Sequence, residues 1–120
     1  PYEDLFPGET KPVFPHDLKV GGAKPYDLLK YCPLGNTFTM KFALEALKGE
    51  QLGLDGFTDL LAVSFSTPDY VGHQFGTHAI ETQDIYLRLD RDLATMITLV
   101  EKEVGKGRIV YQVNRAGKGL

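Results

Sequence analysis

Residues 59–73, which read DLLAVSFSTPDYVGH, constrain the fold of this chain more than any other stretch. An apolar run that ends in Ser, Thr and Pro is typical of a buried strand in a parallel sheet. In α/β proteins, functional side chains lie just beyond the carboxyl ends of such strands. Asp69 and His73 follow the predicted strand 59–66 and are spaced four residues apart. The segment therefore predicts a buried strand that leads into a functional loop over residues 67–77.

Two other segments have the apolar periodicity of helices. The first lies near residues 37–48, where Asn36 or Thr37 could cap its start. The second runs from about residue 77 to about residue 104 and carries an apolar stripe: Ile85, Leu89, Leu93, Met96, Ile97 and Val100. RIVYQV at residues 108–113 predicts another strand. Strand, long helix and strand together predict a βαβ unit with parallel strands, and hence an α/β fold.

The prolines divide the chain unevenly. Residues 1–36 contain six of the seven prolines and predict an extended, turn-rich N-terminal arm. Residues 37–120 predict a partial α/β domain. Its two helices cannot cover both faces of a full sheet, so we expect exposed strand edges. Such edges recruit other chains, so we expect either a larger parent protein or a homo-oligomer in which copies of this chain associate through these edges.

Composition excludes several classes of protein. The net charge of −3 and the pI of about 5.5 give no electrostatic basis for binding nucleic acid. The single cysteine, Cys32, excludes an internal disulfide and a thiolate-rich zinc site. No apolar run approaches the roughly 18 residues that span a membrane. The opening residues Pro1, Tyr2 and Glu3 lack the basic and apolar regions of a signal peptide, so none is expected.

Asp69 and His73 are the main candidates for a functional site. A carboxylate and an imidazole are both good ligands for a divalent metal, which makes a metal site one interpretation. The other is structural: a turn-capping aspartate and a hydrogen-bonded loop histidine. The neighbouring residues can allow close backbone approach or wall a site: Gly72, Gly76, Tyr70 and Phe75. The residues alone leave both interpretations open.

Other polar residues are weaker candidates. His16 follows a proline in the predicted arm and is expected to be a turn residue, and His78 is expected to be exposed. Ser64 and Ser66 lack the Gly-x-Ser-x-Gly pattern that exposes a nucleophile. Asp84 lies on a charged helix face, from which it could reach the loop around residue 73.

Residues 58–93 resemble the alkaline phosphatase superfamily. The most similar branch comprises bacterial phosphate-irrepressible alkaline phosphatases and type I phosphodiesterase/nucleotide pyrophosphatase proteins. The DYVGH-x-FG core carries most of the resemblance, and several flanking motifs also fit it: FPHDL at 14–18, PLGN at 33–36, FALEAL at 42–47, GEQLGLDGFTDLL at 49–61 and VGKG at 104–107. The resemblance thus covers roughly residues 12–107.

This resemblance implies both a fold and a chemistry. The chain would be a fragment of a parallel-sheet sandwich from a periplasmic enzyme that hydrolyses small phosphate esters. In that family two zinc ions act together, and a Thr or Ser nucleophile forms a covalent phosphoenzyme that is then hydrolysed. Carried over, Asp69 and His73 would bind one of these zinc ions. The family's nucleophile lies upstream of residue 1, so no catalytic or further cofactor-binding residue is expected within this chain.

The chain departs from the family after about residue 108. The family's next strand ends in Thr-Ala-Asp-His-Gly and supplies the second zinc, whereas residues 108–120 contain neither Asp nor His. We therefore expect at most a partial zinc site and no phosphatase activity from this chain alone. Two alternatives stay open: a non-catalytic α/β fragment or interaction module, and a relative of phosphodiesterase or sulfatase type.

Overall fold

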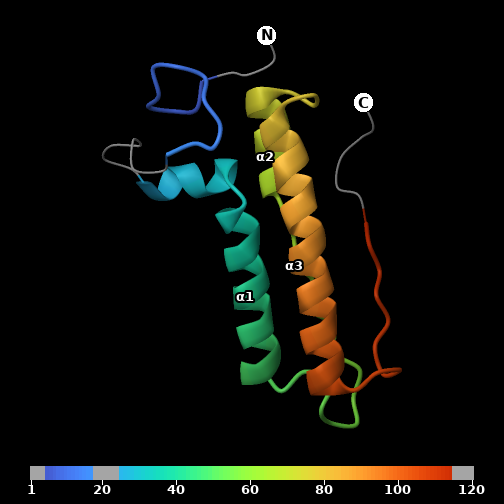
Figure 1. Cartoon of the computed structure of the whole chain (residues 1–120). Coiled ribbons are helices and arrows are strands. Elements are labelled where there is room, and N and C mark those ends of the chain that lie inside the picture. The colour runs from blue at the N-terminus through green and yellow to red at the C-terminus, as the bar shows by residue number, and fades with distance from the viewer. Residues whose placement is uncertain (1–4, 18–24, 115–120) are drawn as a thin grey trace.

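The computed structural model describes residues 5–17 and 25–114, in which helices are joined by irregular segments (Figure 1). A 3-10 helix, η2 (Pro25–Tyr31), precedes three α-helices: α1 (Leu34–Gly49), α2 (Thr67–Phe75) and α3 (Ile80–Val104). Helices α1 and α3 lie side by side, α2 packs against α3, and η2 contacts both α1 and α2. None of the helices in the described ranges is long and apolar enough to cross a bilayer.

The predicted α/β fold with a βαβ unit is wrong for the part of the chain that the structure describes. Residues 59–66 and 108–113 are irregular, and neither forms a strand. The physical reason is that a strand is stabilised by hydrogen bonds to a neighbouring strand, which apolar composition alone does not provide. Leu60 and Val110, which lie within these segments, are 89% and 94% exposed. The prediction of a homo-oligomer was based on exposed strand edges. The described residues contain no strand, so they do not support that prediction.

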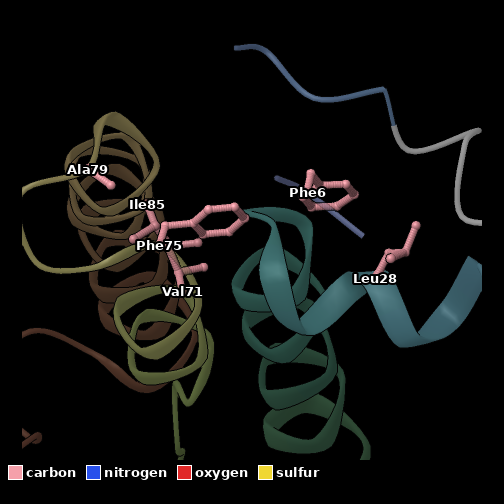
Figure 2. Packing of buried hydrophobic residues seen from close by; sticks show 6 residues of the cluster. All are labelled: Phe6, Leu28, Val71, Phe75, Ala79 and Ile85. Atoms are coloured by element: carbon pink, nitrogen blue, oxygen red, sulfur yellow. The ribbon is translucent and has the colours of Figure 1, made fainter. Parts of the chain in front are cut away.

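Two buried clusters hold the helices together. The α2 cluster combines side chains from distant parts of the chain (Figure 2): Phe6, Leu28, Val71, Phe75, Ala79 and Ile85. The α1–α3 cluster consists of Met40, Leu44, Leu47 and Val100. Phe6 and Leu28 belong to the segment expected to be an extended arm, so parts of that segment contribute to the core. The core therefore draws on the whole described chain.

The long helix α3 buries only part of its predicted apolar stripe. Ile85 and Val100 are buried, whereas Leu93 and Ile97 are 37% and 40% exposed. The three- and four-residue spacing of the apolar side chains shows that they share one face of the helix. That face is buried only where another helix packs against it. In the described structure α1 and α2 provide this cover over only part of α3.

Helix α2 occupies most of the segment that was expected to be a loop. Pro68 lies in its first turn, where a missing N–H costs no hydrogen bond. Gly76 ends the helix with a φ of 89°, a conformation that a side chain would disfavour. The hydroxyl of Thr82, on α3, donates a hydrogen bond to the Gly76 carbonyl at 2.7 Å. This contact fixes the short turn between α2 and α3.

Candidate functional site

Asp69 and His73 lie together on the exposed side of α2. The Asp69 Oδ1 and His73 Nε2 atoms are 3.6 Å apart, and the two side chains are 77% and 82% exposed. Residues four apart on a helix share a face, which explains how a single helix brings them together. Val71 and Phe75 lie on the opposite side of α2 and are buried in the α2 cluster. Burial of the inner face therefore turns the Asp–His pair toward solvent.

The helix also suits the two side chains electrostatically. Asp69 lies in the first turn of α2, where the positive end of the helix dipole favours a carboxylate. His73 lies in the last turn, where the negative end favours a cation or a metal-bearing imidazole. The Asp69 carboxylate is thus at the end of α2 that favours an anion, and the His73 imidazole is at the end that favours a cation or a bound metal.

The geometry of the pair fits two ligands of one zinc ion. Ligand atoms about 2.0–2.1 Å from a tetrahedral zinc lie about 3.3 Å apart. The observed 3.6 Å is within a small side-chain adjustment of that value. Within the described ranges, however, no group of three or more His, Cys, Asp or Glu side chains could hold a metal. The described residues thus place two possible donor atoms near each other without a complete ligand set around them.

The surroundings of the pair match the sequence expectations only in part. Tyr70 is 46% exposed beside the pair, and its ring meets that of Tyr31 edge-on at 6.4 Å. The Lys30 ammonium lies 5.0 Å from the Tyr31 ring centroid and 5.9 Å from that of Tyr70. Phe75 does not wall the site, because it is buried in the core on the other side of α2. Tyr70 is thus the aromatic residue that borders the pair.

The weaker candidates have other roles. Asp84 binds Arg88, with its Oδ2 atom 2.8 Å from the Arg88 Nε, so this carboxylate is engaged along its own helix. The Ser64 and Ser66 hydroxyls are exposed and lie 3.2 Å from each other. His78 is exposed in the turn before α3, as expected.

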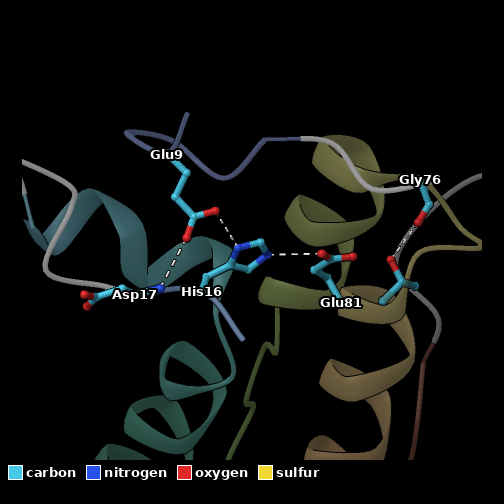
Figure 3. A network of polar contacts seen from close by, with 6 residues as sticks. Glu9, His16, Asp17, Gly76 and Glu81 are labelled. Atoms are coloured by element: carbon cyan, nitrogen blue, oxygen red, sulfur yellow. Dashed lines mark hydrogen bonds and ion pairs between the residues drawn. The ribbon is translucent and has the colours of Figure 1, made fainter. Parts of the chain in front are cut away.

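His16 differs most from its sequence interpretation. It is not a turn residue on the surface: its side chain is 8% exposed, and its two ring nitrogens face two different carboxylates (Figure 3). The Nδ1 atom lies 3.0 Å from Glu9 Oε2, and the Nε2 atom lies 3.1 Å from Glu81 Oε1. Glu81 is 65 residues away along the chain, so no local spacing could have indicated this contact.

The comparisons with known proteins agree with the resemblance found in the sequence. A family model described as type I phosphodiesterase / nucleotide pyrophosphatase matches residues 5–110. A protein of Myroides odoratus named calcium-transporting ATPase is 49% identical over an alignment of 109 residues, and the alignment covers 88% of this chain and 20% of that protein. Alkaline phosphatase PhoV of Synechococcus elongatus is 49% identical over 107 residues, which are 89% of this chain and 20% of that protein.

A solved structure extends the likeness to the fold of this segment. The crystal structure of wild-type alkaline phosphatase PafA aligns with a TM-score of 0.79 and 43% identity over 90% of this chain and 21% of that chain. PafA is a protein of Elizabethkingia meningoseptica. This chain spans about a fifth of the length of the relatives it matches. On the family model and these identities, the chain belongs to the type I phosphodiesterase / nucleotide pyrophosphatase family, and its relatives include alkaline phosphatases.

Proposed function

We propose that this chain supplies two zinc ligands, Asp69 and His73, to a phosphate-ester hydrolase. The observation that carries the proposal is the 3.6 Å separation of their donor atoms on an exposed helix face. The family assignment supports the reaction class, because the relatives include proteins named alkaline phosphatases. The DYVGH motif of the sequence supports the choice of ligands. The zinc dependence and the periplasmic location are part of this proposal and rest on the family resemblance.

The residues of this chain would hold the metal, while other parts of a longer protein would complete the chemistry. Bound zinc would supply Lewis-acid stabilisation to a phosphoryl group. Asp69 would contribute an anionic oxygen, and His73 a neutral nitrogen, from a helix whose inner face is fixed in the core. The nucleophile of the proposed phosphoenzyme mechanism would lie in a part of the longer protein that corresponds to the regions of the relatives outside the alignment. We accordingly propose that this chain alone does not hydrolyse phosphate esters.

Zinc titration by calorimetry tests the ligand assignment. The chain is compared with the Asp69→Ala/His73→Ala double variant and with His78→Ala, a matched control that removes an exposed histidine outside α2. We expect the double variant to bind zinc at least about 10-fold more weakly, while the control binds like the wild type. Equal affinity in all three proteins would refute the assignment.

Hydrolysis of p-nitrophenyl phosphate tests the proposed lack of activity. The rate for the purified chain with added zinc should equal that of the His73→Ala variant, because neither contains a complete metal site. A wild-type rate clearly above the variant rate would show that the chain assembles an active centre, and would overturn this part of the proposal.

A non-catalytic interaction module is the second candidate function. It is favoured by the large apolar side chains that the described structure leaves in solvent, such as Phe42 at 78% and Phe57 at 82% exposed. Mutation-sensitive zinc binding would argue against it. A substrate other than a phosphate monoester is a further variant of the enzyme proposal, and the phosphodiesterase description of the family favours a phosphodiester. A chain extended to the length of its relatives could be assayed on both ester types and on a sulfate ester.

A further inference from the structure

The roles of His16 as donor or acceptor depend on which of its ring nitrogens carry protons. A carboxylate can only accept hydrogen bonds when ionised, and an imidazole donates only from a protonated nitrogen. Glu9 Oε2 faces Nδ1 at 3.0 Å, and Glu81 Oε1 faces Nε2 at 3.1 Å. With ionised carboxylates, both contacts are hydrogen bonds only if the ring carries protons on both nitrogens. His16 then forms a cation between two anions.

The site is buried, which makes the pairing of these charges important. The side chains of His16, Glu9 and Glu81 are 8%, 7% and 5% exposed. A buried charge that loses its partner is strongly destabilising. Glu9 also accepts a hydrogen bond from the Asp17 backbone N–H at 3.3 Å, so Glu81 is the carboxylate that depends more on the ring (Figure 3). Glu81 Oε2 is also buried and has no hydrogen-bond partner among the described residues, which leaves Oε1 as the oxygen that the ring neutralises.

The carboxylates cannot use this arrangement to hold a metal with His16. They face opposite nitrogens of one ring (Figure 3), so their oxygens do not converge on a common point with either nitrogen. The cluster is therefore a set of hydrogen bonds and not a metal centre.

The position of the ring connects this cluster to the candidate site. The His16 ring stacks on Phe75, the last residue of α2, with centroids 5.3 Å apart and planes 19° apart. The His16 ring also stacks on Phe6 with centroids 4.5 Å apart, and Phe6 and Phe75 stack on each other at 6.2 Å. Glu81 belongs to the first turn of α3. His16 thus contacts the end of one helix and the start of the next, on both sides of the turn that orients α2.

We propose that His16, doubly protonated between Glu9 and Glu81, is a positioning residue for the α2 helix and its Asp69–His73 pair. The inference rests on the proposed function where it concerns zinc, and on the fold alone where it concerns α2. It assigns to His16 the role of holding its segment against the α2–α3 turn by polar contacts as well as by packing. Packing alone would be served equally well by any flat aromatic ring.

The variant His16→Phe separates these two contributions. It keeps a ring that can stack on Phe6 and Phe75 but removes both N–H donors, and His78→Phe is the matched control at an exposed histidine. We expect amide hydrogen exchange in residues 69–75 to rise at least about 10-fold in His16→Phe, with residues 40–47 of α1 unchanged. Zinc affinity should fall about 10-fold. Both values should stay at the wild-type level in His78→Phe.

A spectroscopic readout tests the protonation directly. In ¹⁵N-labelled wild-type chain at pH 6, both ring N–H groups of His16 should give resolved proton signals, and Glu81→Gln should shift the Nε2–H signal. A ring with a single N–H, or exchange in His16→Phe equal to that of the wild type, would overturn the proposal. If His16→Phe does not fold, Glu81→Gln takes its place in the exchange experiment, with the same expected and contrary results.

The two proposals can fail separately. Absence of zinc binding in the wild-type chain would refute the zinc assignment, yet the exchange and ring N–H measurements would still decide the role of His16. Conversely, mutation-sensitive zinc binding with unaltered α2 exchange in His16→Phe would retain the metal ligands and refute the positioning role.

Discussion

The substitution Gly35→Ala tests whether the packing of η2, α1 and α2 is as the structure shows. Gly35 is in the first turn of α1, and a Cβ atom placed on it would lie 2.4 Å from the Leu29 carbonyl oxygen and 2.7 Å from Thr67 Oγ1. Both distances are far inside van der Waals contact, and the first involves backbone that cannot simply rotate away. Glycine is thus required at this position by a close approach of three elements.

The expected sign is opposite to that predicted from helix propensity. Replacing a helical Gly by Ala stabilises by about 1 kcal/mol when nothing else changes. Forcing a methyl group into a packed site costs typically about 1–3 kcal/mol, and contact with backbone is at the upper end. Gly35→Ala should therefore destabilise the chain by about 1–2 kcal/mol. Gly72→Ala, in α2, is the matched control, because its Cβ would meet nothing within 4 Å, and it should stabilise by about 0.5–1 kcal/mol.

Urea unfolding followed by circular dichroism at 222 nm measures the difference. The two variants should differ in free energy of unfolding by about 1.5–3 kcal/mol, with similar m-values. The reasoning is refuted if Gly35→Ala is as stable as Gly72→Ala, since the two sites would then be equally open and the close contact of η2 and α2 with α1 would be absent.

Two further predictions concern other parts of the chain. Burial raises the pKa of the Cys32 thiol above its ordinary value of 9.0, so the unfolded chain loses this proton first as the pH rises. The contribution of the protonated thiol to the free energy of unfolding should be complete below about pH 9 and decline above it. Urea midpoints measured from pH 7 to 10 should therefore fall more in the wild type than in Cys32→Ala. Equal changes of the midpoint with pH in the two proteins would contradict this. The exposed side chains of Phe42, Leu60 and Val110 should make copies associate. Light scattering should show a mass that rises with concentration and rises less in Phe42→Ser; a constant monomer mass would contradict it.

Local sequence patterns predicted much of the helical structure and indicated Asp69 and His73 as the candidate pair. Helix periodicity is a property of neighbouring residues, so the long pattern ending near residue 104 could be recognised without knowledge of the fold, and α3 ends at Val104. Asp69 and His73 could likewise be recognised as a pair because they are close together in the sequence. Their four-residue spacing gives a shared face on a helix, although the sequence predicted a loop there.

The failed strand predictions show the limit of this reasoning. The run DLLAVSFS has the composition of a buried strand, but a strand exists only where another strand supplies its hydrogen bonds. Within the described residues no such neighbour is present, and the segment stays irregular. The composition of a segment shows whether it could be buried as a strand. Whether it forms a strand depends on hydrogen bonds to residues elsewhere in the protein.

The sequence by itself determined the family, the helical stripes and the identity of the candidate metal ligands, because each depends on residues close together in the chain. Only the tertiary structure decided the environment of His16, whose partners Glu9 and Glu81 are 7 and 65 residues away. It also decided which side of α2 faces solvent, through burial of Val71 and Phe75. The physical reason is the same in both cases: burial and charge pairing arise from contacts between distant segments, which a local pattern does not encode.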